Sequence, residues 1–216
     1  MNQPLTPLML KALVPATARG EATRRKLLAA AEVEFGARGF HAASVSSITT
    51  RADVGQGTFY LYFHSKEEIF ITLVREIGRA LRTLAAKAGA AAPTRRAGER
   101  EGLVALLRYT LDYPGRYRIV QESQFVDETV FREYHERLAR SYSQSLVEAT
   151  ESGNFKPGDA DTRAWAILGI GQFLAMRYCL WTGRMPADTV IDSAMDMIEN
   201  GIVTPSGLMS PVRVAA

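Results

Sequence analysis

Residues 56–63 bring hydrogen-bonding and aromatic side chains together in a segment about two helical turns long. The amide of Gln56 both donates and accepts hydrogen bonds. Hydroxyl groups follow at Thr58, Tyr60 and Tyr62. The DNA major groove admits an α-helix and presents donors, acceptors and thymine methyl groups on its base edges. These residue types therefore predict a helix that lies in the major groove of double-stranded DNA.

The expected contacts divide into base edges and phosphates. Gln56 is expected to hydrogen-bond a base, and Tyr60 is expected to pack on a thymine methyl group. Gly57 would let the backbone approach the groove closely. Phosphate contacts are expected from Ser44, Thr58, Tyr62 and Lys66. The alternative is an aromatic-rich core helix, which would have to bury the two tyrosine hydroxyls with partners.

The flanking residues predict the elements that would hold this helix. Ser44 can cap a short helix over 45–52, and Ser65 can cap a long helix that begins at Lys66. Phe59 and Phe63 are four residues apart, so they share the face opposite the polar one. That face is expected to anchor on Phe35 of a preceding helix over 23–38, on Ile48 and on Phe70.

The charge distribution fits the same region. The chain has a net charge of +3 over 216 residues, and residues 19–66 carry seven Lys or Arg against four Asp or Glu. The positive excess therefore lies where a DNA-facing module needs it. A solvated surface that is basic without function would give the same count, so charge alone leaves both interpretations open.

These residues resemble the TetR family of bacterial transcriptional repressors over about 20–70. The matching features, in order, are Gly39-Phe40, the capping Ser44, Val45 and Ile48, the turn valine Val54, the Gly-Thr-x-Tyr-x-Tyr-Phe core at 57–63, and Ser65-Lys66-Glu67. Two positions depart from the pattern. Asp53 replaces a turn glycine but tolerates a left-handed backbone. Gly55 replaces a serine and removes a capping hydroxyl, although glycine remains an acceptable cap.

The whole chain reads as helical, because no useful stretch alternates strictly between apolar and polar residues. The expected fold class is all-α: an N-terminal three-helix helix-turn-helix domain followed by a helical ligand-binding and dimerisation domain. The expected organisation is a flexible tail at 1–18, a DNA-binding domain at 19–66, an effector domain at 67–201 and a second tail at 202–216. A small-residue loop is expected at 88–98, between the long helix from Lys66 and the helices that follow.

The resemblance implies a ligand cavity in the second domain and a homodimer built on its last two long helices. The segment 160–181 is apolar on nearly every face, and such a helix must be covered on all sides. A second copy is one cover, and the centre of a monomeric bundle is the alternative.

The effector candidates are the aromatic and methionine side chains of the second domain, which suit an apolar or aromatic ligand. They are Tyr113, Tyr117, Phe125, Phe131, Tyr134, Trp165, Phe173, Met176 and Tyr178. Residues of this kind at helical spacing are also ordinary core. The expected protein is a dimeric repressor of a palindromic operator, released by such an effector. The sequence leaves open the operator, the effector and the direction of the response.

Other classes of function have little support. His41, His64 and His135 show no metal-ligand spacing, and no phosphate loop or nucleophile elbow occurs, so neither an enzyme nor a metal or other cofactor is expected. The single Cys179, the lack of a signal peptide and the lack of a membrane-spanning run predict a cytoplasmic protein. A helical structural or interaction module without sequence-specific DNA binding remains the alternative.

Overall fold

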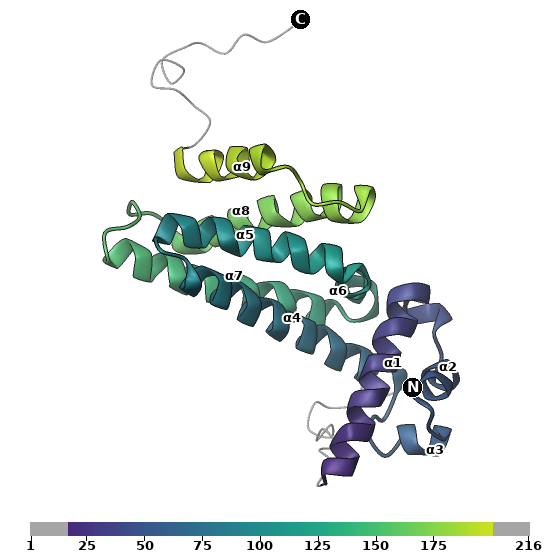
Figure 1. The fold of residues 1–216 in the computed structure, drawn as a ribbon. Helices are drawn as coiled ribbons and strands as arrows, with labels where there is room; N and C mark the ends of the chain where they lie inside the picture. The colour runs from purple at the N-terminus through teal and green to yellow at the C-terminus, as the bar shows by residue number, and fades with distance from the viewer. Residues whose placement is uncertain (1–16, 201–216) are drawn as a thin grey trace, which may run out of the picture.

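The computed structural model describes residues 17–200, and these form helices without any strand (Figure 1). The helices are α1 (Ala18–Ala42), α2 (Val45–Ala52), α3 (Gln56–Phe59), α4 (Lys66–Ala91), α5 (Arg95–Asp112), α6 (Pro114–Val126), α7 (Glu128–Glu151), α8 (Ala160–Leu174), the π-helical segment η2 (Ala175–Thr182) and α9 (Asp188–Asn200). The all-α prediction is confirmed. The predicted tails lie mostly outside the described residues, but Thr17 caps α1 and Ala18 begins it, so the first tail was drawn two residues too long.

The first half has a filled aromatic core. Phe35, Phe59, Phe63 and Phe70 are all almost fully buried, together with Ile48. The rings of Phe35 and Phe70 meet edge to face with centroids 5.1 Å apart. The predicted anchoring of Phe59 and Phe63 on these residues is therefore confirmed.

The predicted caps are present and fix the short helices. The hydroxyl of Ser44 accepts from the backbone N–H of Ser47 at 3.0 Å, and the hydroxyl of Ser47 accepts from that of Ser44 at 3.1 Å, which closes a reciprocal cap. Asp53 adopts the left-handed conformation expected for the turn, with φ 54°. Ser65 caps α4, whereas Gly55 caps α3 without a side-chain hydrogen bond.

The predicted helix over 56–63 is too long. The α-helix ends at Phe59, and the N–H groups of Leu61 and Tyr62 bond three residues back, to Thr58 and Phe59. Phe63 still reaches the core after this tighter turn, because the N–H of Phe63 donates to the carbonyl oxygen of Phe59 at 3.0 Å.

The predicted loop over 88–98 is too long, because only residues 92–94 lie between the two helices. Helix α4 continues to Ala91, and Thr94 caps α5 by accepting from the N–H of Ala97. Alanine is the strongest helix former, so the alanine-rich run extends α4 rather than ending it. Glycines then let the two helices approach, since a Cβ on Gly98 would lie 3.0 Å from the carbonyl oxygen of Gly89.

Helix α4 joins the two halves of the molecule. Its first turns pack in the same core as α1 and α3, through Ile69, Phe70 and Leu73. Its later turns lie along α5 and α7. Figure 1 shows α2 and α3 at one end of the molecule and α8 and α9 at the other, with α4 running between the two regions.

Candidate DNA-binding surface and effector cavity

The predicted base-contacting side chains lie on one exposed surface. Gln56 and Gly57 are exposed, and Tyr60 is half exposed with its ring edge-on to Phe59 at 5.3 Å. A Cβ on Gly57 would meet nothing within 4 Å, so the surface there is open. We call the set Gln56, Gly57, Tyr60 and Leu61 the α3 face. Within residues 17–200, no other part of the protein covers the α3 face. Contact with DNA bases requires a surface that is exposed in this way.

Leu61 is a member of the α3 face that sequence reasoning missed. Its side chain is 68% exposed. Lying next to Tyr60 and four residues after Gly57, it places an aliphatic group where a thymine methyl could be covered. Its position between two tyrosines, outside the buried pair Phe59 and Phe63, was the available signal.

The other predicted contacts differ in exposure. Ser44 is exposed but its hydroxyl serves the reciprocal cap, which leaves a second lone pair for other partners. Thr58 and Tyr62 are half-buried, and Tyr62 packs against the aromatic core. Their phosphate contacts remain predictions.

Lys66 is engaged inside the domain. Its ammonium donates to the carbonyl oxygens of Phe40 at 2.8 Å and Ala43 at 2.9 Å, and it lies 4.2 Å from the centroid of the Phe40 ring. The side chain therefore fixes the segment between α1 and α2. A phosphate contact would depend on the remaining N–H of the ammonium.

A buried carboxylate orders the arginines beside α2. Glu34 is 3% exposed and accepts from the Nε of Arg51 at 2.7 Å, with Arg38 at 3.5 Å. The hydrogen bond from Arg51 outweighs burial and lowers the pKa of Glu34. Arg51 is thus held at the surface with part of its guanidinium still available to a phosphate.

The second half contains a cavity of about 630 Å³. Helix α4 lines it from Ile77 to Ala90, and α7 lines it from Tyr134 to Ser145. At about 1.5 Å per residue, the α4 stretch is about 20 Å long. The cavity is therefore elongated, and α5 and α8 close its other sides.

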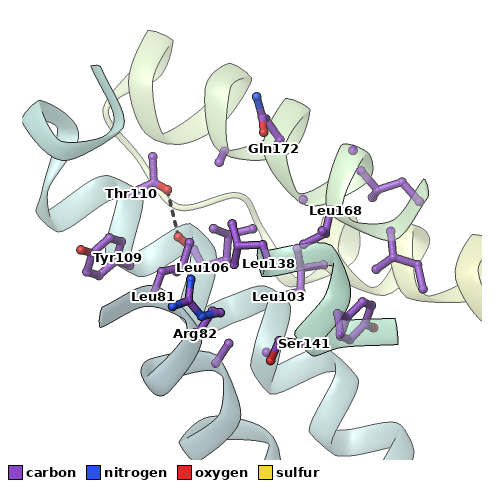
Figure 2. A pocket seen from close by; sticks show the side chains of 18 of the residues that line it. Leu81, Arg82, Leu103, Leu106, Tyr109, Thr110, Leu138, Ser141, Leu168 and Gln172 are labelled. Atoms are coloured by element: carbon purple, nitrogen blue, oxygen red, sulfur yellow. Dashed lines mark hydrogen bonds between the residues drawn. The ribbon is translucent and has the colours of Figure 1, made fainter. Parts of the chain in front are cut away.

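The wall of this cavity is mainly aliphatic. Figure 2 shows Leu81, Leu103, Leu106, Leu138 and Leu168 among the lining side chains. Several of the polar groups on the wall have partners within the protein, as the hydroxyl of Thr110 shows by donating to the carbonyl of Leu106 at 3.0 Å (Figure 2). Such a surface suits an apolar ligand.

Comparisons with known proteins agree on one family. The family model described as "Bacterial regulatory proteins, tetR family" matches residues 27–73. The uncharacterized HTH-type transcriptional regulator YdgC of Bacillus subtilis is 47% identical over 66 residues, 31% of this chain and 34% of YdgC. A second such regulator of that organism, YhgD, is 27% identical over 150 residues, 67% of this chain and 78% of YhgD. The part of the chain that matches the TetR-family model is therefore the DNA-binding end, residues 27–73.

The fold of the chain also matches a solved structure over most of its length. The fatty acid degradation regulator FadR of Bacillus halodurans superposes with a TM-score of 0.73 at 18% identity, covering 83% of this chain and 96% of that one. The aligned part spans about a third of YdgC, so YdgC informs the DNA-binding end alone. The family and these relatives are transcriptional regulators rather than enzymes. In residues 17–200 no group of His, Cys, Asp and Glu is arranged to hold a metal ion.

Some predicted effector residues line the cavity and others do not. Those on the wall are Tyr113, Tyr117, Tyr134, Trp165 and Phe173. Phe125 is wrong as a lining residue, because it is 80% exposed at the end of α6. Phe131 lies one turn before the wall, with its ring 4.4 Å from that of His135. Met176 and Tyr178 also lie off the wall, on η2 beyond α8.

The lining leucines are what sequence reasoning missed. Leu103 and Leu106 are three residues apart on α5 and look like ordinary core positions. The predicted effector residues were all aromatic or methionine, so these leucines were not among them. Burial of Tyr134, deep against the wall, raises the pKa of its phenol, which therefore stays neutral at physiological pH.

Polar contacts connect this cavity to the DNA-binding half of the chain. Arg116 lines the cavity, donates to Glu32 of α1 at 2.8 Å, and lies 4.2 Å from the centroid of the Tyr113 ring. Nearby, the carboxylate of Glu122 on α6 accepts from the backbone N–H of Phe40, with both oxygens at 2.8 Å. Helices α1 and α6 are therefore joined by hydrogen bonds at this contact.

An apolar surface is exposed along α8 and η2. Trp165, Gly169 and Phe173 are four residues apart on one face of α8, where Trp165 is 43% and Phe173 67% exposed. Trp181 on η2 is 70% exposed. Large exposed apolar side chains in a row mark an interaction surface. Across residues 17–200, no helix is long and apolar enough to cross a membrane.

Proposed function

We propose that this TetR-family regulator is a dimeric repressor that binds an inverted-repeat operator and is released by an apolar effector in the cavity. The observation that carries the proposal is the course of α4. Its first turns pack beside the α3 face, and its later turns form a wall of the cavity. One helix therefore contributes to both sites, so a ligand that shifts α4 changes the position of the α3 face.

The exposed surface of α8 and η2 supports the dimer. A second copy that covers Trp165, Phe173 and Trp181 would bury apolar area that is otherwise in water. Figure 1 shows α8 and α9 at the end of the molecule opposite the α3 face. A two-fold axis there would present two α3 faces, which is why the operator should be an inverted repeat with half-sites at least about one helical turn apart.

The cavity supports an aliphatic effector. It is elongated, about 630 Å³ in volume, and its exposed wall is mainly apolar, with five leucines among the lining residues. The structurally similar protein of Bacillus halodurans is named a fatty acid degradation regulator, which agrees with a chain-like apolar ligand. Aromatic ligands remain compatible with Tyr113, Tyr117 and Trp165 on the same wall.

The contacts of α6 support release rather than recruitment. Arg116 and Tyr113 line the cavity, and Arg116 bonds Glu32 of α1. A ligand that displaces Arg116 would break this contact and so release α1 from α6 at that point. An effector shifts a protein between two conformations only if it binds one of them more tightly. A ligand of this kind would disfavour the conformation that contains the Arg116–Glu32 contact. Action on chromosomal DNA would place the protein in the cytoplasm.

Duplex selection tests the proposal against the alternative of a helical interaction module. The full chain should enrich an inverted repeat from a random duplex pool, and its affinity should fall steeply with salt as counterions are released. Absence of any enriched sequence would favour the interaction module. Trp181→Glu should give folded monomers of weak operator affinity, because Trp181 does not line the cavity, whereas Trp181→Phe should remain dimeric. A dimeric Trp181→Glu protein would move the interface elsewhere.

A further inference from the structure

Three arginines line the cavity within the described residues: Arg82, Arg95 and Arg116. Arg95 pairs with Glu99 at 2.6 Å, and Arg116 pairs with Glu32 at 2.8 Å. Within residues 17–200, Arg82 makes neither an ion pair nor a side-chain hydrogen bond with the protein. Each of the two other charges therefore has its counter-ion in the protein, and Arg82 has none in the same part of the chain.

The surroundings of Arg82 are apolar and positively charged. A Cβ on Gly78 would lie 3.3 Å from an Nη of Arg82 and 2.9 Å from the Tyr134 ring, so the guanidinium lies beside that ring over the space glycine leaves. Burial first, and then the charges of Arg137 and Arg79, lower the pKa of Arg82. The group nevertheless stays charged at physiological pH. A partly buried guanidinium without a carboxylate partner in the protein is available to pair with an anionic group of a ligand.

The rest of the cavity suits a hydrocarbon chain that starts at this cation. Arg82 lies between Ile77 and Ala90 along the α4 wall, and Figure 2 shows it among Leu81, Leu106 and Leu138. Toward the α4–α5 turn, Glu99 is occupied by Arg95 and by the hydroxyl of Tyr142. At that end the charge of Arg95 is therefore matched by Glu99, although the buried Nε of Arg95 makes no hydrogen bond within the protein.

We propose that the effector is an unbranched aliphatic chain with a free carboxylate, and that the carboxylate pairs with Arg82. The inference rests on the proposed function, since it names the ligand class of the same cavity. It adds that the headgroup is anionic and is bound inside the protein. A guanidinium meets a carboxylate with two parallel hydrogen bonds, which gives both affinity and a fixed orientation of the chain.

Decanoate, methyl decanoate and 1-decanol, used below micelle-forming concentrations, test the headgroup. They share the hydrocarbon chain, and only decanoate carries a charge. Binding to the full chain is followed by the fluorescence of Trp165, which lines the cavity, in a Trp181→Phe background that removes the exposed indole. Decanoate should bind at least about tenfold more tightly than 1-decanol, the scale of one charge-assisted hydrogen bond.

Variants of Arg82 and the neighbouring Arg79 test whether the preference for decanoate over 1-decanol depends on Arg82. Arg82→Met keeps an apolar stem and should bring decanoate to the affinity of 1-decanol, without weakening 1-decanol. Arg82→Lys should keep part of the preference. Arg79→Met is the matched control, because Arg79 lies one turn earlier on α4, is exposed and does not line the cavity. It should leave the preference nearly unchanged.

The outcomes separate the two proposals. Equal binding of decanoate and 1-decanol to the unmodified protein, or an unchanged preference in Arg82→Met, would overturn the anionic headgroup and leave the apolar effector site standing. Failure of all three compounds to bind would overturn both. If Arg82→Met does not fold, the Arg82→Lys and Arg79→Met comparison and the three-ligand series still decide the assignment.

Discussion

The two halves of the chain use their interiors differently. The DNA-binding half is filled by buried aromatic rings, among them Phe35, Phe59 and Phe70. The second half leaves a cavity of about 630 Å³ between α4, α5, α6, α7 and α8. A recognition surface must hold a fixed shape, which dense packing provides. A sensor must have free energy left to gain when its ligand enters, and an unfilled apolar wall supplies that gain.

Matched leucine truncations should show this contrast most strongly. Leu27→Ala removes a side chain that is fully buried in the filled half, and it should destabilise the protein by about 2–5 kcal/mol. Leu106→Ala removes one that already borders the cavity, so it should cost about 1–2 kcal/mol, less than the range for filled sites. Urea unfolding of both variants measures this. Equal costs would mean that the cavity wall is packed as tightly as the aromatic core.

The two halves meet at the α1–α6 contact, and adding one methyl group there should push the two helices apart. A Cβ on Gly36 would lie 2.9 Å from the Cα of Gly115, a backbone atom that cannot yield locally. Gly36→Ala should therefore cost about 1–3 kcal/mol, as overpacking does, and should also weaken the response of DNA binding to ligand. In Gly102→Ala, where a Cβ meets nothing within 4 Å, stability should be unchanged or slightly higher. If DNA binding by Gly36→Ala still responded fully to ligand, the α1–α6 contact would not be part of the mechanism.

On the α3 face, specificity should separate from stability. Gln56→Ala should change the preferred base at one position of each half-site by about 1–3 kcal/mol, with the melting temperature unchanged because Gln56 is exposed. Lys66→Ala should lower stability as well as affinity, since its ammonium holds the carbonyls of Phe40 and Ala43. A Lys66→Ala protein of unchanged stability would show that its role is phosphate contact alone.

The smallest effect should be a pH dependence at Glu34. Its pKa is lowered in the folded protein by the hydrogen bond from Arg51. The stabilisation is therefore present above the unfolded pKa of about 4.3 and is lost as the pH falls through the lower folded value. The free energy of unfolding of the native chain should exceed that of Glu34→Gln by about 1 kcal/mol at pH 6. That difference should shrink below pH 4, and a constant difference would contradict the ion-pair assignment.

Local signals explain which features the sequence predicted. Ser44, Ser65 and the left-handed Asp53 depend on neighbours within three or four residues, and each was found at its expected place. The pairing of Phe59 with Phe63 follows from helical spacing. Gln56, Gly57 and Tyr60 are close in sequence, so their exposure on one surface followed from the same spacing, and their contacts with DNA remain predictions.

Features that depend on distant contacts were not predictable. Lys66 reaches Phe40 across 26 residues and Glu122 reaches Phe40 across 82, and neither pairing leaves a mark in local sequence. The cavity also depends on contacts between distant parts of the chain. A leucine such as Leu106 lines the cavity, rather than packing in a core, only because the opposite helices do not come into contact there. The extension of α4 through 87–91 was missed because small residues were taken for a loop.

Coupling between the cavity and the α3 face is the central claim, and one titration tests it. The affinity of the full chain for its selected duplex is measured with and without saturating decanoate or 1-decanol, whichever binds, while Trp165 fluorescence reports occupancy. We expect the affinity to fall by about 5–150-fold, the usual range of coupling between two sites. An occupied cavity with unchanged operator affinity would contradict the account, because α4 would then connect the two sites without coupling them.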